Sequence, residues 1–211
     1  MKKILILAAS PRKNGNTNSI VKVVTEEFAE AEDEVSCEVI DLNDTDIKPC
    51  QSCRCCQTDW DDYFCVQEDD LTTADNFEDG ESLFDKINAA DMLVFATPVY
   101  SWYCTPPMKT LLDRCVYTFN KYYDDVSGTH GGERGPSLWA GKKAALITTC
   151  GYPPEKGADL LAEGLRRYCN HSQLEFIGSL AEKNAGYVHE FMDEDKIARA
   201  KAFAGELLDS L

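Results

Sequence analysis

Five short apolar segments alternate with five segments of helical periodicity, and this alternation constrains the fold more than any other feature of the chain. The candidate strands are Lys3–Ala8, Val35–Asp41, Met92–Ala96, Lys143–Thr148 and Leu174–Leu180. The third and fourth are continuously apolar, as expected for strands covered on both faces. Strands that alternate with helices favour a parallel sheet with helices on both sides. The sequence therefore predicts a doubly wound, three-layer α/β/α structure, with residues 1–211 forming a single domain.

The helical segments are marked by apolar residues that recur every three or four positions. They are the segment after Thr17 (Ile20, Val24, Phe28), then Glu81 to Ala90, Met108 to Phe119, Leu160 to Tyr168, and Ile197 to Leu208. Two long segments lack any such period: a cysteine-rich insertion at about 48–80 and a loop at about 121–141. Loops of this length are usually functional or mobile.

The charge balance excludes two classes of partner. The formal net charge of −16 argues against a general nucleic-acid surface or an anionic membrane surface, because both require clusters of Lys and Arg. No apolar run approaches the roughly 20 residues that cross a membrane. The apolar segment at the N-terminus is interpreted as the first strand instead of a signal peptide, so a cytoplasmic location is expected.

The first candidate strand runs into a loop of small polar residues and then directly into a helix. The free N–H groups and the dipole of a helix N-terminus attract an anion. The candidate phosphate-binding residues are Ser10, Arg12, Asn14, Asn16, Thr17 and Asn18. The loop has neither GxGxxG nor GxxxxGK[ST], which favours a mononucleotide over a dinucleotide or a P-loop nucleotide. The alternative is an ordinary strand-to-helix turn that is capped by Asn16 or Thr17.

Two further loops should meet the first one. Thr97–Pro107 follows the third strand and Thr149–Pro154 follows the fourth, and ligands of doubly wound sheets bind beyond the carboxyl ends of strands. The aromatic residues of the former loop and the small residues of the latter suit a planar ring. The candidates for contacting this ring are Pro98, Val99, Tyr100, Ser101 and Trp102, together with Thr149, Cys150 and Gly151.

Together these loops resemble the NADPH-dependent FMN reductase family. The matching elements are Ser10-Pro11-Arg12-x-x-Gly15-Asn16-Thr17, Thr97-Pro98-Val99-Tyr100, Pro107-Met108-Lys109-x-x-Leu112-Asp113-Arg114 and Thr148-Thr149-Cys150-Gly151. The resemblance implies a flavodoxin-like fold with a five-stranded parallel sheet of order 2-1-3-4-5. It also implies FMN as cofactor, with its phosphate in the first loop and its ring against the other two. Asp113 and Arg114 are expected to form a structural ion pair instead of touching the cofactor.

The implied activity is an FMN-dependent NAD(P)H oxidoreductase, which passes electrons through the flavin to a small acceptor such as a flavin or quinone. Because flavin carries this chemistry, no side chain is nominated as acid or base. Trp102, Tyr103 and the loop at about 121–141 are candidates for shaping the outer half of the site. The resemblance also implies a homodimer or homotetramer.

Five of the ten cysteines lie between Cys50 and Cys65. Cys50, Cys53 and Cys56 are spaced by two residues, which with Cys65 suits iron–sulfur ligation. This segment resembles the iron–sulfur flavoproteins, a branch of the same family whose cysteine motif binds a [4Fe–4S] cluster, although the gap of eight residues before Cys65 is longer than expected.

Other interpretations of these thiols remain open. One is that the cysteines are free, either buried or reactive. Another is that four thiolates form a structural zinc site. A cluster would make the protein an electron carrier with a redox protein partner, whereas reactive thiols would make it a redox sensor. The remaining cysteines are expected to be small apolar residues, and His130, His171 and His189 to be surface residues.

Overall fold

Five parallel strands form one sheet in the computed structural model, which describes residues 1–57, 63–73, 77, 79–119, 137–184 and 191–211. The strands are β1 (Lys2–Ala8), β2 (Val35–Asp41), β3 (Met92–Pro98), β4 (Lys143–Cys150) and β5 (Glu175–Lys183). Their order is β2-β1-β3-β4-β5 and every neighbouring pair is parallel, which confirms the expected 2-1-3-4-5 order. The order reverses direction between β1 and β3, so a crevice is expected beyond the carboxyl ends of these two strands.

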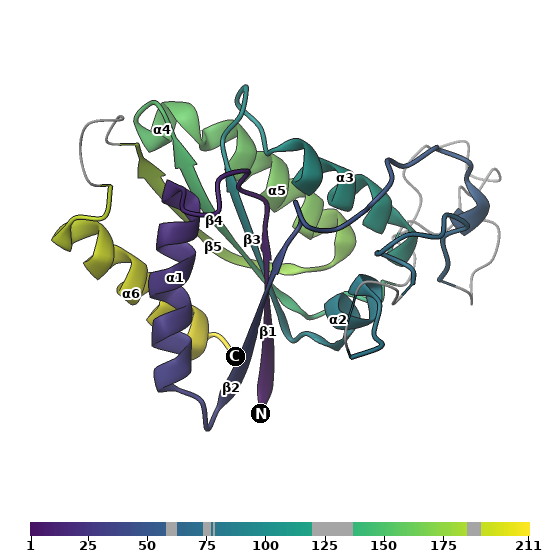
Figure 1. The fold of residues 1–211 in the computed structure, drawn as a ribbon, viewed down its shortest axis with the longest axis horizontal. Helices are drawn as coiled ribbons and strands as arrows, with labels where there is room; N and C mark the ends of the chain where they lie inside the picture. The colour runs from purple at the N-terminus through teal and green to yellow at the C-terminus, as the bar shows by residue number, and fades with distance from the viewer. Residues whose placement is uncertain (58–62, 74–76, 78, 120–136, 185–190) are drawn as a thin grey trace.

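Helices cover both faces of the sheet (Figure 1). They are α1 (Asn16–Glu30), α2 (Leu83–Ala89), α3 (Pro106–Arg114), α4 (Pro154–Gly157), α5 (Asp159–Ser172) and α6 (Glu194–Asp209). Side chains alternate between the two faces along each strand. Ile4 and Ile6 pack with α1 and α6, whereas Leu5 and Leu7 pack with α2, α3 and α5. The three-layer α/β/α arrangement is thereby confirmed. None of the helices within the described ranges is long and apolar enough to cross a membrane.

The helix predicted from Met108 to Phe119 ends earlier than expected. α3 stops at Arg114, and a 3₁₀ turn, η2 (Cys115–Thr118), continues the chain. The Thr118 hydroxyl donates to the carbonyl of Cys115 at 2.7 Å, which satisfies a carbonyl at the helix end. Cys115 and Phe119 are nevertheless both buried, and both belong to the core cluster that also contains α2, α3 and α5 residues.

The expected ion pair between Asp113 and Arg114 is wrong. Asp113 pairs with Lys109 on the surface, one helical turn away. Arg114 pairs instead with Asp69, and both side chains have zero exposure to solvent. Asp113 lies on the exposed face of α3, so it cannot reach the buried guanidinium.

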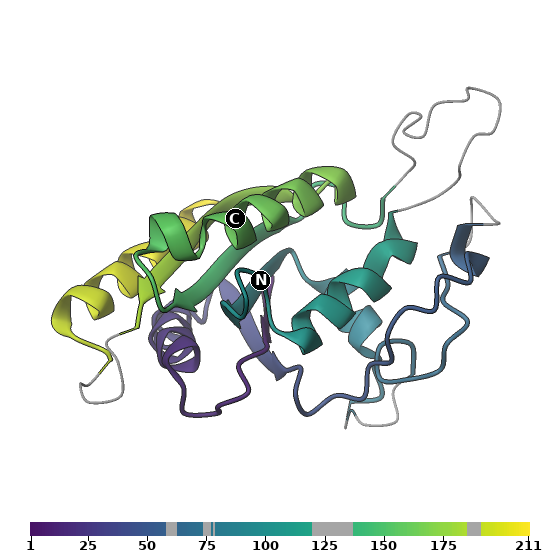
Figure 2. The same cartoon turned by 90° about the horizontal axis from the view of Figure 1, so that it is seen from above.

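The Arg114–Asp69 pair attaches the segment after β2 to α3. Arg114 Nη1 also donates to the carbonyl of Lys48 at 2.8 Å. Asp69 Oδ2 accepts from the Lys48 N–H at 2.9 Å, and Asp69 Oδ1 accepts from the Leu71 N–H at 3.1 Å. The cysteine-bearing segment, drawn in blue, extends past the end of α3 from this attachment (Figure 1, Figure 2).

Several predicted features lie outside the described residues. These are most of the loop at about 121–141, part of the cysteine-rich insertion, His130 and His189. Trp139 is described and is 1% exposed, packed against Phe119 at a centroid distance of 5.7 Å. His171 is exposed, as predicted, and its ring meets the edge of Phe119.

We expect Arg114→Met to lower the free energy of unfolding by about 3–5 kcal/mol, because it leaves the Asp69 carboxylate buried without its cationic partner. Asp113→Ala is the control, since its exposed pair with Lys109 contributes about 0.5 kcal/mol or less. Urea denaturation followed by circular dichroism measures both. Equal effects of the two substitutions would contradict the assigned role of the buried pair.

Candidate functional site

Hydrogen bonds join the three loops that follow β1, β3 and β4. The Ala9 N–H donates to the carbonyl of Ala96 at 2.8 Å, and the Thr105 hydroxyl donates to the carbonyl of Ala9 at 2.8 Å. The Val99 N–H donates to the carbonyl of Thr149 at 2.8 Å. The carboxyl ends of the strands on both sides of the switch point therefore form one connected surface.

The N-terminus of α1 has no side-chain cap. Its N-cap residue is Gly15, which has no side chain to accept from the first turn. Asn16 instead donates from Nδ2 to Asn184 Oδ1 at 3.0 Å, and the Thr17 hydroxyl bonds with the Thr149 hydroxyl at 2.8 Å. The alternative of an ordinary turn capped by Asn16 or Thr17 is therefore wrong, and the first-turn N–H groups stay available to an anion.

Gly15 is required by the close approach of the loop to itself. A Cβ atom at this position would lie 2.9 Å from the carbonyl oxygen of Arg12 and 3.2 Å from Ser10 Oγ. The Gly15 N–H donates to that same carbonyl at 2.8 Å. The loop thus folds tightly around its own backbone before α1 begins.

The two cations of the loop differ in their surroundings. Lys13 forms an ion pair with Asp44, and the hydrogen bond to Asp44 raises the pKa of Lys13. Arg12 is exposed and has no ion pair with any residue that the structure describes. A guanidinium without a carboxylate partner at an uncapped helix N-terminus suits a bidentate contact with phosphate.

The remaining residues predicted for this loop occupy different positions. Ser10 is buried and its hydroxyl donates to the carbonyl of Arg12 at 3.2 Å, whereas Asn14 is exposed. Asn18 Nδ2 donates to the carbonyl of Lys13 at 3.0 Å, and its buried Oδ1 has no partner. The side chains of Ser10 and Asn18 therefore order the loop itself.

The loop after β3 contains a strained turn. The Tyr100 and Tyr103 backbones bond to each other in both directions, at 2.8 and 3.0 Å. Between them Ser101 has φ 49° and Trp102 has φ 66°. Left-handed backbone at two successive non-glycine residues is costly and clusters at functional sites. The turn presents Trp102 outward, with 52% of its surface exposed.

A hollow of about 130 Å³ lies between this turn and the loop after β4. The Trp102 and Tyr152 rings stack across it, with centroids 6.3 Å apart and planes 15° from parallel. Its lining is Val99, Ser101, Trp102, Cys150, Gly151, Tyr152 and Gly157. Five residues predicted for the ring site thus share one apolar, partly aromatic hollow: Val99, Ser101, Trp102, Cys150 and Gly151.

Three further predicted residues border the hollow without lining it. Pro98 ends β3, Tyr100 begins the turn with 47% exposure, and Thr149 is buried at the end of β4. Thr149 connects the two halves of the site. Its hydroxyl forms a hydrogen bond with the Thr17 hydroxyl, and its carbonyl accepts one from the Val99 N–H. The uncapped helix end and the ring-sized hollow fit a cofactor that has both a phosphate and a planar ring.

Cys150 is not a nucleophile in this arrangement. It is 1% exposed, and its thiol donates to the carbonyl of Tyr152 at 3.1 Å. Burial raises the pKa of Cys150, so the unreactive thiol form is favoured at neutral pH.

Sequence reasoning missed three residues that support the site. Asn184 holds Asn16, Asn43 Nδ2 donates to the carbonyl of Ser10 at 2.9 Å, and Tyr152 stacks with Trp102. Asn43 and Asn184 each follow the carboxyl end of a strand, which is the signal that could have identified them. Tyr152 belongs to the loop Thr149–Pro154, which was predicted to border the ring site, but Tyr152 was not among the residues predicted to contact the ring.

The four predicted metal ligands surround a second, smaller hollow. Cys50, Cys53, Cys56 and Cys65 all line this cysteine hollow, which has a volume of about 30 Å³, while the neighbouring Cys55 does not line it. Cys50 and Cys53 are exposed at its rim, and Cys56 and Cys65 are half-buried. In the part of the chain that the structure describes, no three Cys, His, Asp or Glu side chains are close enough to hold a metal ion. The thiols therefore match a metal centre in kind and number, but they would have to move closer to bind one.

The backbone and the charges of the cysteine segment are consistent with this grouping. Ser52 (φ 55°) and Arg54 (φ 62°) are left-handed, which winds the chain around the hollow. Burial raises the pKa of Cys56, and the neighbouring Cys65 and Cys53 thiols raise it further.

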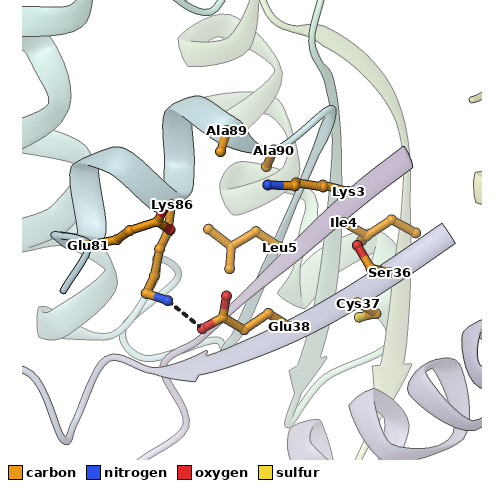
Figure 3. A pocket seen from close by; sticks show the side chains of 10 residues that line it. All are labelled: Lys3, Ile4, Leu5, Ser36, Cys37, Glu38, Glu81, Lys86, Ala89 and Ala90. Atoms are coloured by element: carbon orange, nitrogen blue, oxygen red, sulfur yellow. Dashed lines mark hydrogen bonds and ion pairs between the residues drawn. The ribbon is translucent and has the colours of Figure 1, made fainter. Parts of the chain in front are cut away.

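A third hollow, of about 220 Å³, lies over the amino-terminal halves of β1 and β2 (Figure 3). Two lysines, Lys3 and Lys86, line it, and Lys86 points to Glu38 and pairs with both Glu38 and Asp79. None of its lining residues, all of them described, has a buried side-chain polar atom without a partner. It is remote from the carboxyl ends of the strands, where ligands of doubly wound sheets bind.

The strand order and the helices on both faces of the sheet define a flavodoxin-like fold. Residues 2–184 match the model of the family described as NADPH-dependent FMN reductase. The chain belongs to this family.

The curated relatives that match in sequence are iron–sulfur flavoproteins. One from Methanosarcina thermophila is 29% identical over 121 residues, covering 57% of this chain and 56% of the relative. One from Archaeoglobus fulgidus is 32% identical over 112 residues, covering 53% of this chain and 48% of the relative. The chain thus matches about half the length of these relatives.

Similar folds occur among solved structures. The apo form of an NADH:FMN oxidoreductase (EMOB) aligns with a TM-score of 0.62 and 18% identity, covering 100% of this chain and 90% of that protein. An FMN-dependent NADH-azoreductase from Bacillus anthracis, in complex with FMN, aligns with a TM-score of 0.64 and 16% identity, covering 100% and 99%. At these identities the likeness establishes the flavodoxin-like fold alone.

We expect the double substitution Arg12→Ala/Thr17→Ala to weaken FMN binding by about 100-fold or more, because it removes the guanidinium beside the helix N-terminus and the Thr17–Thr149 hydrogen bond that positions this terminus. Fluorescence titration of the flavin-free protein with FMN measures the dissociation constant. Lys13→Ala is the matched control, since Lys13 is already paired with Asp44 and should retain FMN. Undiminished FMN binding by a folded double variant would place the phosphate elsewhere.

Proposed function

We propose that this chain is an FMN-dependent oxidoreductase that accepts electrons from NADH or NADPH and passes them to a small acceptor, such as a flavin or quinone. One observation carries the proposal: the uncapped N-terminus of α1, with unpaired Arg12 beside it, is joined by the Thr17–Thr149 hydrogen bond to the hollow at Trp102. This geometry suits a phosphate at one end and a planar ring at the other. Family membership and the names of the structural relatives support the same cofactor.

Each part of the site would contribute to binding and orientation. The first-turn N–H groups of α1 and the Arg12 guanidinium would hold the phosphate. The bond between Thr17 and Thr149 would fix the distance from the phosphate site to the ring site. The strained turn at Ser101 and Trp102 would place an aromatic wall beside the ring.

FMN, when bound, supplies the capacity to accept two electrons and deliver them to a second substrate. The protein's own contribution would be an apolar surface on one side of the ring, formed by Val99 and the stacked Trp102–Tyr152 pair. Trp102 is 52% and Tyr152 61% exposed, so both have surface left to contact a planar substrate that stacks from solvent. Because flavin carries the electron transfer, no side chain is assigned as acid or base, and Cys150 is too buried to act as one.

The direct test is anaerobic mixing of the FMN-loaded protein with NADH and, separately, with NADPH. We expect the visible flavin absorbance to be lost within the turnover time of the enzyme, and to return when a quinone or free FMN is added. The Arg12→Ala/Thr17→Ala variant should show no such signal from bound flavin. Failure of both nicotinamides to reduce bound FMN would contradict the proposed electron donor.

A second candidate function is electron carriage by an iron–sulfur flavoprotein. The arrangement of Cys50, Cys53, Cys56 and Cys65 around one hollow favours it, as do the names of the curated relatives. A cluster there would exchange single electrons with a protein partner.

We expect Cys53→Ser to abolish the iron and acid-labile sulfide that the protein retains after anaerobic reconstitution, because a ligand is removed. Cys55→Ser is the matched control, since Cys55 lies two residues away but does not line the cysteine hollow. Iron and sulfide contents are measured chemically on desalted protein. Equal contents in the two variants would remove Cys53 from the ligand set.

A further inference from the structure

α5 contains a glycine in its interior, where alanine would make a more stable helix. Glycine within a helix is unfavourable because it loses more backbone entropy on folding than any other residue. The surroundings of such a glycine show whether packing requires it. Gly205, in the interior of α6, has nothing within 4 Å of the point where a Cβ atom would stand, whereas Gly164 of α5 has no such space.

The ring of Tyr103 occupies the space beside Gly164. A Cβ atom at Gly164 would lie 3.0 Å from Tyr103 Cε2 and 3.3 Å from the Tyr103 hydroxyl oxygen. Carbon atoms in contact prefer a separation of about 3.5–4.0 Å, so a methyl group at this position would push the ring away. Gly164 thus allows an aromatic side chain from the loop after β3 to lie directly on the backbone of α5.

Tyr103 closes the strained turn that borders the hollow at Trp102. Its backbone bonds with that of Tyr100 in both directions, and Ser101 and Trp102 between them are left-handed. Left-handed backbone at non-glycine residues persists only where the surrounding structure holds it. The Tyr103 side chain, which packs on Gly164, fixes one end of this turn against α5.

A second glycine of the same segment supports the other wall of the hollow. Gly157 ends α4, and a Cβ atom there would lie 3.1 Å from the Cβ atom of Tyr152, whose ring stacks with Trp102. Gly157 itself lines the hollow, but Gly164 does not. The segment 154–172 therefore supports both aromatic walls, and of these two glycines only Gly164 reaches the hollow through another residue.

We propose that Gly164 is a positioning residue for the flavin ring: by leaving room for Tyr103, it holds the strained turn in the shape that presents Trp102 to the cofactor. This inference rests on the proposed FMN site. It assigns a role in ring binding to a helix residue that does not line the hollow, and it gives Tyr103 a specific part in shaping the site.

Gly164→Ala tests the proposal by adding one methyl group. The group should displace the Tyr103 ring and loosen the turn, while alanine in place of glycine favours the helix itself. In the flavin-free protein, we expect the Tyr100 and Tyr103 amides to exchange with solvent about 10-fold faster, while amides in β1 and β3 exchange at native rates or slower. FMN and riboflavin should both bind about 10-fold more weakly, with an unchanged affinity ratio, because the phosphate loop is untouched.

Two further variants show where the methyl group acts. Gly205→Ala is the matched control, since its methyl group meets no other residue, and it should leave both amide exchange at the turn and flavin binding unchanged. Tyr103→Ala removes the ring that the methyl group would meet, and it should weaken binding of both flavins by itself. In that background Gly164→Ala should have no further effect, because substitutions at residues in contact are not additive.

Several results would overturn the proposal while the proposed function stands. They are native flavin affinities or native amide exchange at the turn in Gly164→Ala, faster exchange throughout β1 and β3, a changed ratio of the FMN and riboflavin affinities, and an equal loss of affinity with and without the Tyr103 ring. Native protein that binds neither FMN nor riboflavin would instead contradict the proposed function, and this inference would fail with it.

Discussion

The hydrogen bond between the Thr17 and Thr149 hydroxyls is the interaction on which the proposed flavin site depends. It connects residues 132 positions apart, at the start of α1 and the end of β4, and both side chains are buried. Because Thr149 also accepts from the Val99 N–H, one residue fixes the phosphate loop and the aromatic turn relative to each other. The parallel sheet makes this geometry available, since it places all these carboxyl ends on one edge.

A second attachment organises the other half of the molecule. The buried Arg114–Asp69 pair, together with the backbone of Lys48, holds the segment after β2 against α3. The same guanidinium borders the cysteine hollow, so the helix that follows the aromatic turn also forms a wall of the thiol site. The flavin site and the cysteine hollow are thus positioned by opposite ends of α3, at Pro106 and at Arg114.

The helices and strands could be predicted well from the sequence, but the ion pairs and hydrogen bonds that join them could not. Continuous apolar runs identified the central strands, and the small polar loop before Thr17 identified the helix end that stays uncapped. The partner of Arg114 was not predictable, because Asp69 lies 45 positions away inside a segment without periodicity. The left-handed turn at Ser101 and Trp102 was also hidden, since it contains no glycine to signal positive φ. A supporting residue such as Asn184 is marked in the sequence only by its position just after the carboxyl end of a strand, which is a weak signal.

Comparison of FMN with riboflavin as ligands tests the central claim most directly. The two molecules share the ring and differ in the phosphate, so their affinity ratio isolates the contribution of the α1 N-terminus and Arg12. Calorimetric titration of the flavin-free protein should give FMN an affinity about 100-fold or more above that of riboflavin. Equal affinities would contradict the account, because they would show that the uncapped helix end does not bind the cofactor.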